Sequence, residues 1–106
     1  MTQLCKVSKL GQFRLYPMRL HLFISGLVQG VNFRHYTVQT AQNLHLTGWV
    51  KNLSDGRVEI LAEGTKNELE QLLRWCQKGP PAAQVELVKE KWSDAPGEFS
   101  DFTINR

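Results

Sequence analysis

The chain has 106 residues, of which 42% are hydrophobic and 22% are charged, and its formal net charge is +3. This size and composition are typical of one soluble globular domain, and no apolar run approaches the roughly 18 residues of a membrane-spanning helix. The charge excess comes from residues 1–17, which contain Lys6, Lys9 and Arg14 but no acid. Nucleic-acid binding needs basic side chains gathered on one face, so this distribution argues against nucleic acid as the main partner.

Residues 1–17 are predicted to be a basic arm ahead of one domain that spans residues 18–106. The arm lacks the apolar stretch of about 7 to 15 residues and the small-residue cleavage site of a secretory signal, which favours a cytoplasmic protein. Cys5 lies in the arm, and Cys76 lies in an amphipathic segment. Their number and spacing match neither a disulfide framework nor a metal site, so we expect two free thiols and no metal.

The first predicted element is a strand over residues 19–25, where hydrophobic side chains recur with a period of two. The side chains expected on its buried face are Leu20, Leu22 and Ile24. Two glycines interrupt this pattern in residues 26–32, and helical spacing begins at residue 33 and continues to residue 44. A glycine-containing turn is therefore predicted to lead from a strand into a helix.

Two further strands are predicted over residues 46–53 and 57–63. The Ser-Asp-Gly sequence between them is typical of a hairpin, because glycine tolerates a positive φ, so the two strands should pair antiparallel. Thr65 and Glu68 form a predicted capping box for a second helix, which Gly79 and the two prolines after it should end. The expected buried face of that helix is Leu69, Leu72, Leu73 and Cys76.

The last two predicted strands cover residues 84–92 and 99–106. The element order is therefore β-α-β-β-α-β with one additional strand. This order predicts an α+β fold, a ferredoxin-like sandwich whose antiparallel sheet of four strands plus a C-terminal strand carries two helices on one face. Many unrelated functions occur on this fold, so the activity must be argued from the site.

The turn over residues 26–34 joins a strand to a helix start, where unpaired N–H groups and the positive end of the helix dipole meet. Glycine lets the backbone approach an anion closely, and Arg34 could bind two oxygens of a phosphate. The pattern is neither a Walker loop nor a dinucleotide fingerprint. From these residues alone, a tight turn with a solvated arginine stays open as the alternative to an anion site.

Asn52 lies near the end of the second predicted strand, and its amide both donates and accepts hydrogen bonds. On spacing alone, an asparagine that forms the turn before Ser-Asp-Gly is the simpler interpretation. His21, His35 and His45 have no partner at metal-ligand spacing and no evident Ser or Cys nucleophile. They are interpreted as structural or surface residues.

Three linked motifs resemble those of the acylphosphatase family and occur in the same order. Residues 26–34 (Gly-Leu-Val-Gln-Gly-Val-Asn-Phe-Arg) resemble its phosphate loop. Residues 48–52 (Gly-Trp-Val-Lys-Asn), followed by residues 55–59 (Asp-Gly-Arg-Val-Glu), resemble a second block, and a third begins at Gly79. The resemblance covers about residues 18–106, and several motifs in order are more specific than one glycine pattern. It favours a functional site over both simpler interpretations.

The resemblance implies metal-independent hydrolysis of acyl phosphates to a carboxylate and inorganic phosphate, with no cofactor. It implies that Arg34 binds the phosphoryl group and that Asn52 orients the attacking water. It also implies a phosphate-binding loop made by Gln29, Gly30, Val31, Asn32, Phe33 and Arg34. The chain departs from the family pattern at His45, where a glycine is usual, and in the arm. Neither departure touches the implied site.

The expected partners are a small acyl phosphate and inorganic phosphate, as product and inhibitor, for a monomer that binds neither nucleic acid nor membrane. One alternative is an RNA-binding module of the same element order, but residues 57–63 lack the aromatic side chains on which such modules stack bases. A second is the acylphosphatase-like segment of larger carbamoyl-handling maturation proteins, for which a further domain would be expected after Arg106. A third is a family member that only binds phosphate or a partner.

Overall fold

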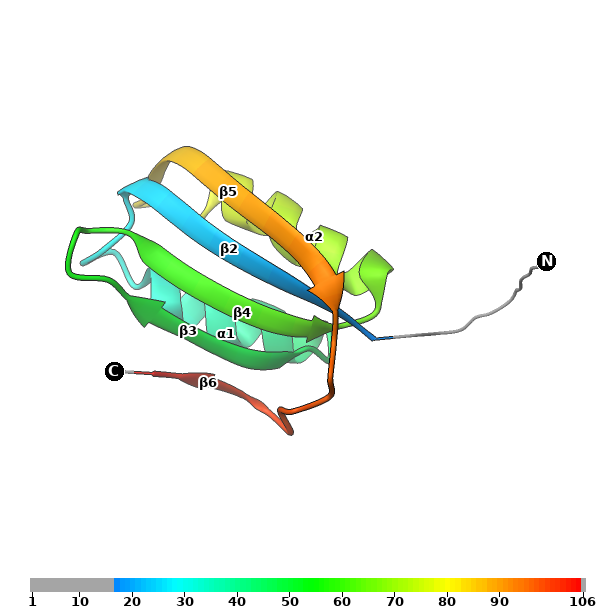
Figure 1. Ribbon diagram of the computed structural model, residues 1–106. Coiled ribbons are helices and arrows are strands. Elements are labelled where there is room, and N and C mark those ends of the chain that lie inside the picture. The colour runs from blue at the N-terminus through cyan, green and yellow to red at the C-terminus, as the bar shows by residue number, and fades with distance from the viewer. Residues whose placement is uncertain (1–16, 106) are drawn as a thin grey trace.

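The computed structural model describes residues 17–105, which form five strands and two helices (Figure 1). The strands are β2 (Met18–Leu27), β3 (Thr47–Asn52), β4 (Val58–Gly64), β5 (Gln84–Asp94) and β6 (Phe102–Ile104). The helices are α1 (Phe33–Asn43) and α2 (Lys66–Lys78). Apart from Pro17, the predicted basic arm and its Cys5 lie outside the described residues. In the described part of the chain, no helix has the length and apolar character that crossing a membrane requires.

The strands form one sheet in the order β5-β2-β4-β3-β6, and both helices cover the same face of it (Figure 1). Strand β2 pairs antiparallel with β4 and β5, and β3 pairs antiparallel with β4. The predicted ferredoxin-like α+β fold is therefore confirmed. The expected antiparallel arrangement is wrong at one edge, because β6 pairs parallel with β3 and makes the sheet mixed.

The path of the chain explains this mixed edge. After β5 the chain passes the end of the sheet and reaches the opposite edge, where it enters beside β3 in the same direction (Figure 1). Periodicity in the sequence indicates that a strand forms, but it does not indicate which neighbour the strand joins. The last strand is also shorter than the predicted range of residues 99–106, since only Phe102–Ile104 pair with β3.

The hydrophobic core lies between the sheet and the two helices. Leu20, Leu22 and Ile24 of β2 are all fully buried, as their alternation predicts. The buried residues of α2 are Leu69, Leu72 and Cys76. Leu73, which was expected on the same face, is only half-buried at the edge of the core.

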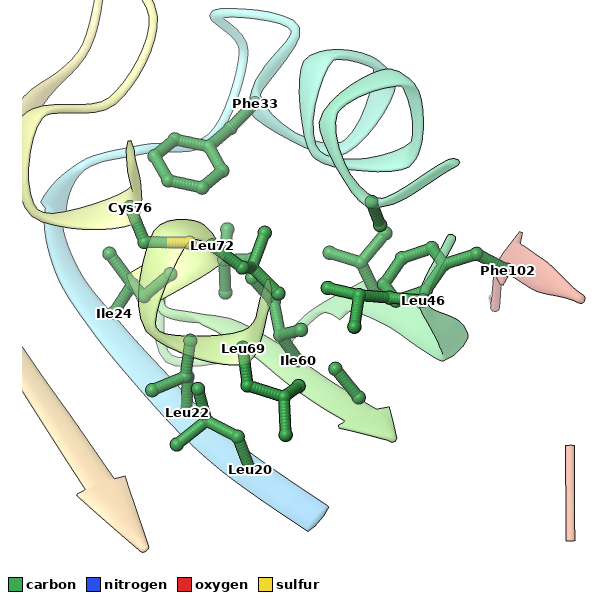
Figure 2. Packing of buried hydrophobic residues seen from close by; sticks show 14 of the residues in the cluster. Leu20, Leu22, Ile24, Phe33, Leu46, Ile60, Leu69, Leu72, Cys76 and Phe102 are labelled. Carbon is green, nitrogen blue, oxygen red and sulfur yellow. The ribbon is translucent and has the colours of Figure 1, made fainter. Parts of the chain in front are cut away.

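Phe33 and Cys76 connect the start of α1 to this core. Figure 2 shows Phe33 pointing from the start of α1 into the cluster that contains Leu72 and Cys76. The ring of Phe33 also packs edge-on against Trp75, with 5.4 Å between the ring centroids. Burial raises the pKa of the Cys76 thiol, which keeps it protonated and unreactive. Cys76 is unpaired among residues 17–105.

The start of α2 differs from the predicted capping box. Thr65 is the N-cap residue, as expected, and Glu68 lies in the first turn. The Thr65 side chain caps no backbone N–H; instead, its hydroxyl donates a hydrogen bond to the Glu68 carboxylate. The two side chains therefore meet each other rather than the backbone groups that a capping box satisfies.

Helix α1 ends in a backbone motif that normally favours glycine. The N–H of Leu46 donates to the carbonyl of Ala41 at 2.9 Å, and the N–H of His45 donates to that of Gln42 at 3.0 Å. This is a Schellman motif, whose residue after the C-cap adopts the left-handed conformation. His45 occupies that position with φ 59°. The departure from the family pattern noted in the sequence thus falls on a strained backbone position.

We expect His45→Gly to raise the free energy of unfolding by about 0.5 to 1 kcal/mol. A non-glycine residue in the left-handed conformation costs about 1 to 2 kcal/mol, and glycine removes this cost. Part of the gain is lost because glycine also gives the unfolded chain more conformational freedom. Urea unfolding measures the change. His45→Ala is the matched control, because it removes the exposed imidazole but keeps the Cβ. Equal stabilisation by both variants would show that the imidazole, rather than the backbone, is the source.

Candidate active site

Three strand ends meet at one end of the sheet. Strands β2, β3 and β6 all run in the same direction, so their C-terminal ends lie together (Figure 1). Ile24 of β2 and Asn52 of β3 both lie opposite Val58 of the intervening strand β4. Ile104 of β6 lies opposite Val50, two residues before Asn52. The turn that follows β2 is therefore brought close to Asn52, and β6 lies on the other side of β3.

Helix α1 begins at this same end of the sheet. Its N-cap residue, Asn32, has left-handed backbone (φ 62°, ψ 25°), and its side chain makes no capping hydrogen bond. Gly30 also has a positive φ of 76°, a conformation in which other residues are strained. The first turn of α1 contains no acid. Its N–H groups and the helix dipole therefore provide donors and positive potential for an anion.

A cavity of about 310 Å³ occupies this end of the molecule. Its walls come from the turn after β2, the first turn of α1 and the ends of β3 and β6: Val28, Gln29, Gly30, Asn32, Phe33, Arg34, His35, Asn52 and Ile104. Arg34 and Asn52, separated by 18 positions in sequence, thus line one cavity. Of the predicted loop residues, Val31 does not line it, because its side chain packs against the hydrophobic core.

Three residues of the cavity wall were not assigned to the site from the sequence. Val28 and Ile104 supply apolar surface, and His35 supplies an exposed imidazole next to Arg34. His35 was interpreted only as a structural or surface residue, although its place in the first turn of α1 was a signal that it could reach the site. Ile104 had no such signal, since the parallel position of β6 is not predictable from its own pattern.

Arg34 is the basic side chain of the cavity. Elsewhere, Arg19 pairs with Glu63 and Glu98, and Arg57 pairs with Asp55 at 2.8 Å. Within residues 17–105, by contrast, Arg34 forms no ion pair, and none of the side chains that line the cavity is acidic. Arg34 is half-buried. Its guanidinium is therefore available to an anion that enters the cavity.

Asn52 contributes a polar atom that has no protein partner. It is the last residue of β3, and its Oδ1 atom is buried without a hydrogen-bond donor among the described residues. A buried amide oxygen costs free energy unless a donor reaches it. Asn52 also lines the cavity, so its side chain lies beside the space that a ligand or a water molecule would enter.

Metal-binding side chains do not gather in the part of the chain that the structure describes. No group of three or more His, Cys, Asp or Glu side chains with the proximity needed to hold a metal ion occurs there. His21, one of the three histidines, lies away from the cavity and contacts Glu59 across the sheet, with 2.6 Å between Nε2 and Oε2. His45 lies at the far end of α1.

The fold and this cavity define a ferredoxin-like protein with a site for a small anion between a helix N-terminus, an arginine and a neutral amide. A family model described as Acylphosphatase matches residues 20–104, which include the whole cavity wall. The chain belongs to the acylphosphatase family.

Individual relatives support this assignment. An acylphosphatase of Chloroflexus aurantiacus is 51% identical over 87 residues, which are 82% of this chain and 95% of that protein. The crystal structure of acylphosphatase from Bacillus subtilis is 36% identical, with a TM-score of 0.81 and coverage of 84% of this chain and 99% of that one. The acylphosphatase structure from Coxiella burnetii is 41% identical, with a TM-score of 0.76 and coverage of 85% and 94%. The expected function, an acylphosphatase that acts on acid anhydrides, is confirmed.

Proposed function

We propose that the cavity hydrolyses acyl phosphates without a metal ion, with Arg34 holding the phosphoryl group and Asn52 directing the water that attacks it. The observation that carries this proposal is that one cavity is lined by the start of α1, by Arg34, which forms no ion pair within residues 17–105, and by Asn52, whose Oδ1 atom has no donor among those residues. The helix start and the Arg34 guanidinium suit a phosphoryl group, and the Asn52 amide suits a water molecule.

Binding of the phosphoryl group follows from charge and donor geometry. The first-turn N–H groups of α1 donate to phosphate oxygens, and the turn at Gly30 lets the backbone come close. Arg34 adds a charge-assisted contact that can engage two oxygens at once. These groups stabilise the charge that spreads over the equatorial oxygens as the phosphoryl group is transferred, a task that metal ions perform in kinases.

The attacking water is held by Asn52. In this proposal the Asn52 amide turns its Oδ1 atom toward the cavity and accepts a hydrogen bond from the water, which leaves an oxygen lone pair free to attack phosphorus. The new oxygen–phosphorus bond forms as the bond between phosphorus and the acyl oxygen breaks. The carboxylate departs with the electron pair, and an oxygen of the phosphate accepts the water proton. A carboxylate is a good leaving group, so positioning and charge stabilisation supply most of the catalysis.

The proposal extends to the partners of the protein. Inorganic phosphate is a product and also an inhibitor, because it fits the same donors as the phosphoryl group. Nucleic acid is not a partner, which is supported by the pairing of Arg19, Lys51 and Arg57 with carboxylates on the sheet and in the β3–β4 hairpin loop. The protein is also proposed to act as a monomer. Within residues 17–105, the large hydrophobic side chains that are exposed number only a few: Leu27, Tyr36, Leu87 and Ile104. The buried thiol of Cys76, which is unpaired among residues 17–105, fits a cytoplasmic location.

Hydrolysis of a simple aryl acyl phosphate should continue unchanged in an excess of chelator and should be inhibited competitively by inorganic phosphate. The donors of the cavity are N–H groups and a guanidinium, which bind phosphate oxygens directly. Initial rates with and without chelator, over a range of phosphate concentrations, measure both effects. Loss of activity in chelator that a divalent ion restores would contradict the metal-independent mechanism. Non-competitive inhibition would place phosphate outside the cavity.

A further inference from the structure

The side chain of Gln29 bridges the turn after β2 and the β3–β4 hairpin. Its Nε2 atom donates to the carbonyl oxygen of Leu53 at 2.8 Å and to that of Arg57 at 2.9 Å. Leu53 and Arg57 are the two residues that flank the tip of the hairpin, and Leu53 follows Asn52 directly. One amide group therefore contacts both sides of the hairpin loop, next to Asn52.

The two carbonyl groups that Gln29 contacts already accept hydrogen bonds within the hairpin. The Leu53 carbonyl already accepts from the N–H of Gly56 at 3.2 Å, and the Arg57 carbonyl already accepts from the N–H of Leu53 at 2.8 Å. A carbonyl oxygen accepts two hydrogen bonds, and Gln29 uses the second position on each. The hairpin closes without Gln29, so the added effect of this side chain is to join the hairpin to the turn.

The bridge also leaves the Gln29 side chain unable to bind phosphate. A primary amide has two N–H donors, and both are directed at the hairpin carbonyls. The remaining side-chain atom is an acceptor oxygen, which a phosphate anion would repel. Gln29 nevertheless lines the cavity together with Arg34 and Asn52. Its side chain therefore contacts the support of Asn52 rather than the phosphoryl group.

We infer that Gln29 is a positioning residue that fixes the distance and orientation of Asn52 relative to the phosphate-binding turn. The turn binds the phosphoryl group, and Asn52 at the end of the hairpin binds the water. The side chain of Gln29 links the turn to the hairpin. An in-line attack tolerates little error, since a displacement of about 1 Å can cost about 10²-fold in rate. This inference rests on the role proposed for Asn52.

The test uses Gln29→Met, which keeps the length of the side chain and the backbone amide but removes both donors. We expect turnover to fall by about 10- to 100-fold while the inhibition constant of inorganic phosphate stays within about twofold. Gln29→Ala serves as a second variant, and Gln71→Ala, an exposed glutamine of α2, is the matched control. Thermal unfolding establishes that each variant is folded.

The decisive comparison repeats Gln29→Met in an Asn52→Ala background. A residue that acts only through Asn52 should have little further effect there, less than about threefold. Effects that multiply in the double variant, or a phosphate affinity that falls together with turnover, would overturn the inference. Normal turnover of folded Gln29→Met and Gln29→Ala would also overturn it. If Asn52→Ala alone leaves turnover unchanged, the proposed function of Asn52 fails first, and the inference about Gln29 fails with it.

Discussion

Replacing Arg34 with alanine is expected to lower the turnover of an acyl phosphate by at least about 10³-fold, the range seen when an arginine that stabilises a transferred phosphoryl group is lost. Arg34 forms no ion pair within residues 17–105, so no carboxylate of those residues neutralises its charge. The substitution also removes a contact made to the phosphate in the ground state. Inhibition by inorganic phosphate should therefore weaken along with turnover.

Two further variants make this result specific to Arg34. Arg34→Lys keeps the positive charge but loses the planar, two-pronged donor geometry, and it should recover only part of the lost rate. Arg74→Ala removes an exposed arginine of α2 that does not line the cavity, and its turnover should match that of the unmodified protein. Near-normal phosphate affinity in folded Arg34→Ala would show that another group binds the phosphoryl oxygens.

Asn52→Ala is expected to lower turnover by about 10² to 10³, or roughly 2.7 to 4 kcal/mol of activation free energy, with little change in phosphate inhibition. The N–H groups of α1 and the guanidinium of Arg34 remain in place, so the phosphate site is preserved. Only the water loses its acceptor. The substitution also removes a buried oxygen that has no partner among the described residues, so stability should not fall through a lost hydrogen bond.

Asn67→Ala, an exposed asparagine in the first turn of α2, is the matched control and should leave turnover unchanged. Surface substitutions of this kind usually alter stability by no more than about 0.5 kcal/mol. Normal turnover in Asn52→Ala would show that Asn52 only forms the turn and does not orient the water. A joint loss of turnover and phosphate inhibition would instead make it part of the phosphate site.

Local patterns predict the elements of this fold well, because each strand and helix buries its own face. The alternation that buries Leu20, Leu22 and Ile24 is visible in the sequence, as is the helical spacing of Leu69, Leu72 and Cys76. Local sequence patterns predict the pairing between distant elements less well than they predict the elements themselves. The parallel contact between β6 and β3 depends on how the chain crosses the sheet after β5, which no local pattern encodes.

The same distinction applies to the candidate site. Gln29, Arg34 and Asn52 lie in motifs that can be recognised, and they line one cavity together. The contribution of Ile104 follows from the long-range pairing of β6 and could not be predicted. The hydrogen bonds from the Gln29 side chain to the hairpin carbonyls span 24 and 28 residues, so local sequence patterns do not predict them either.

Calorimetric titration of inorganic phosphate into Arg34→Ala and Asn52→Ala, beside the unmodified protein, tests the separate roles of the two residues most directly. Loss of charge-assisted hydrogen bonds worth about 1.5 to 3 kcal/mol should weaken binding to Arg34→Ala by at least about tenfold. Asn52→Ala should bind phosphate with a Kd within about threefold of the unmodified protein, although its turnover is low. Equal weakening in both variants, or tight binding in Arg34→Ala, would contradict the assignment of phosphate to Arg34 and of water to Asn52.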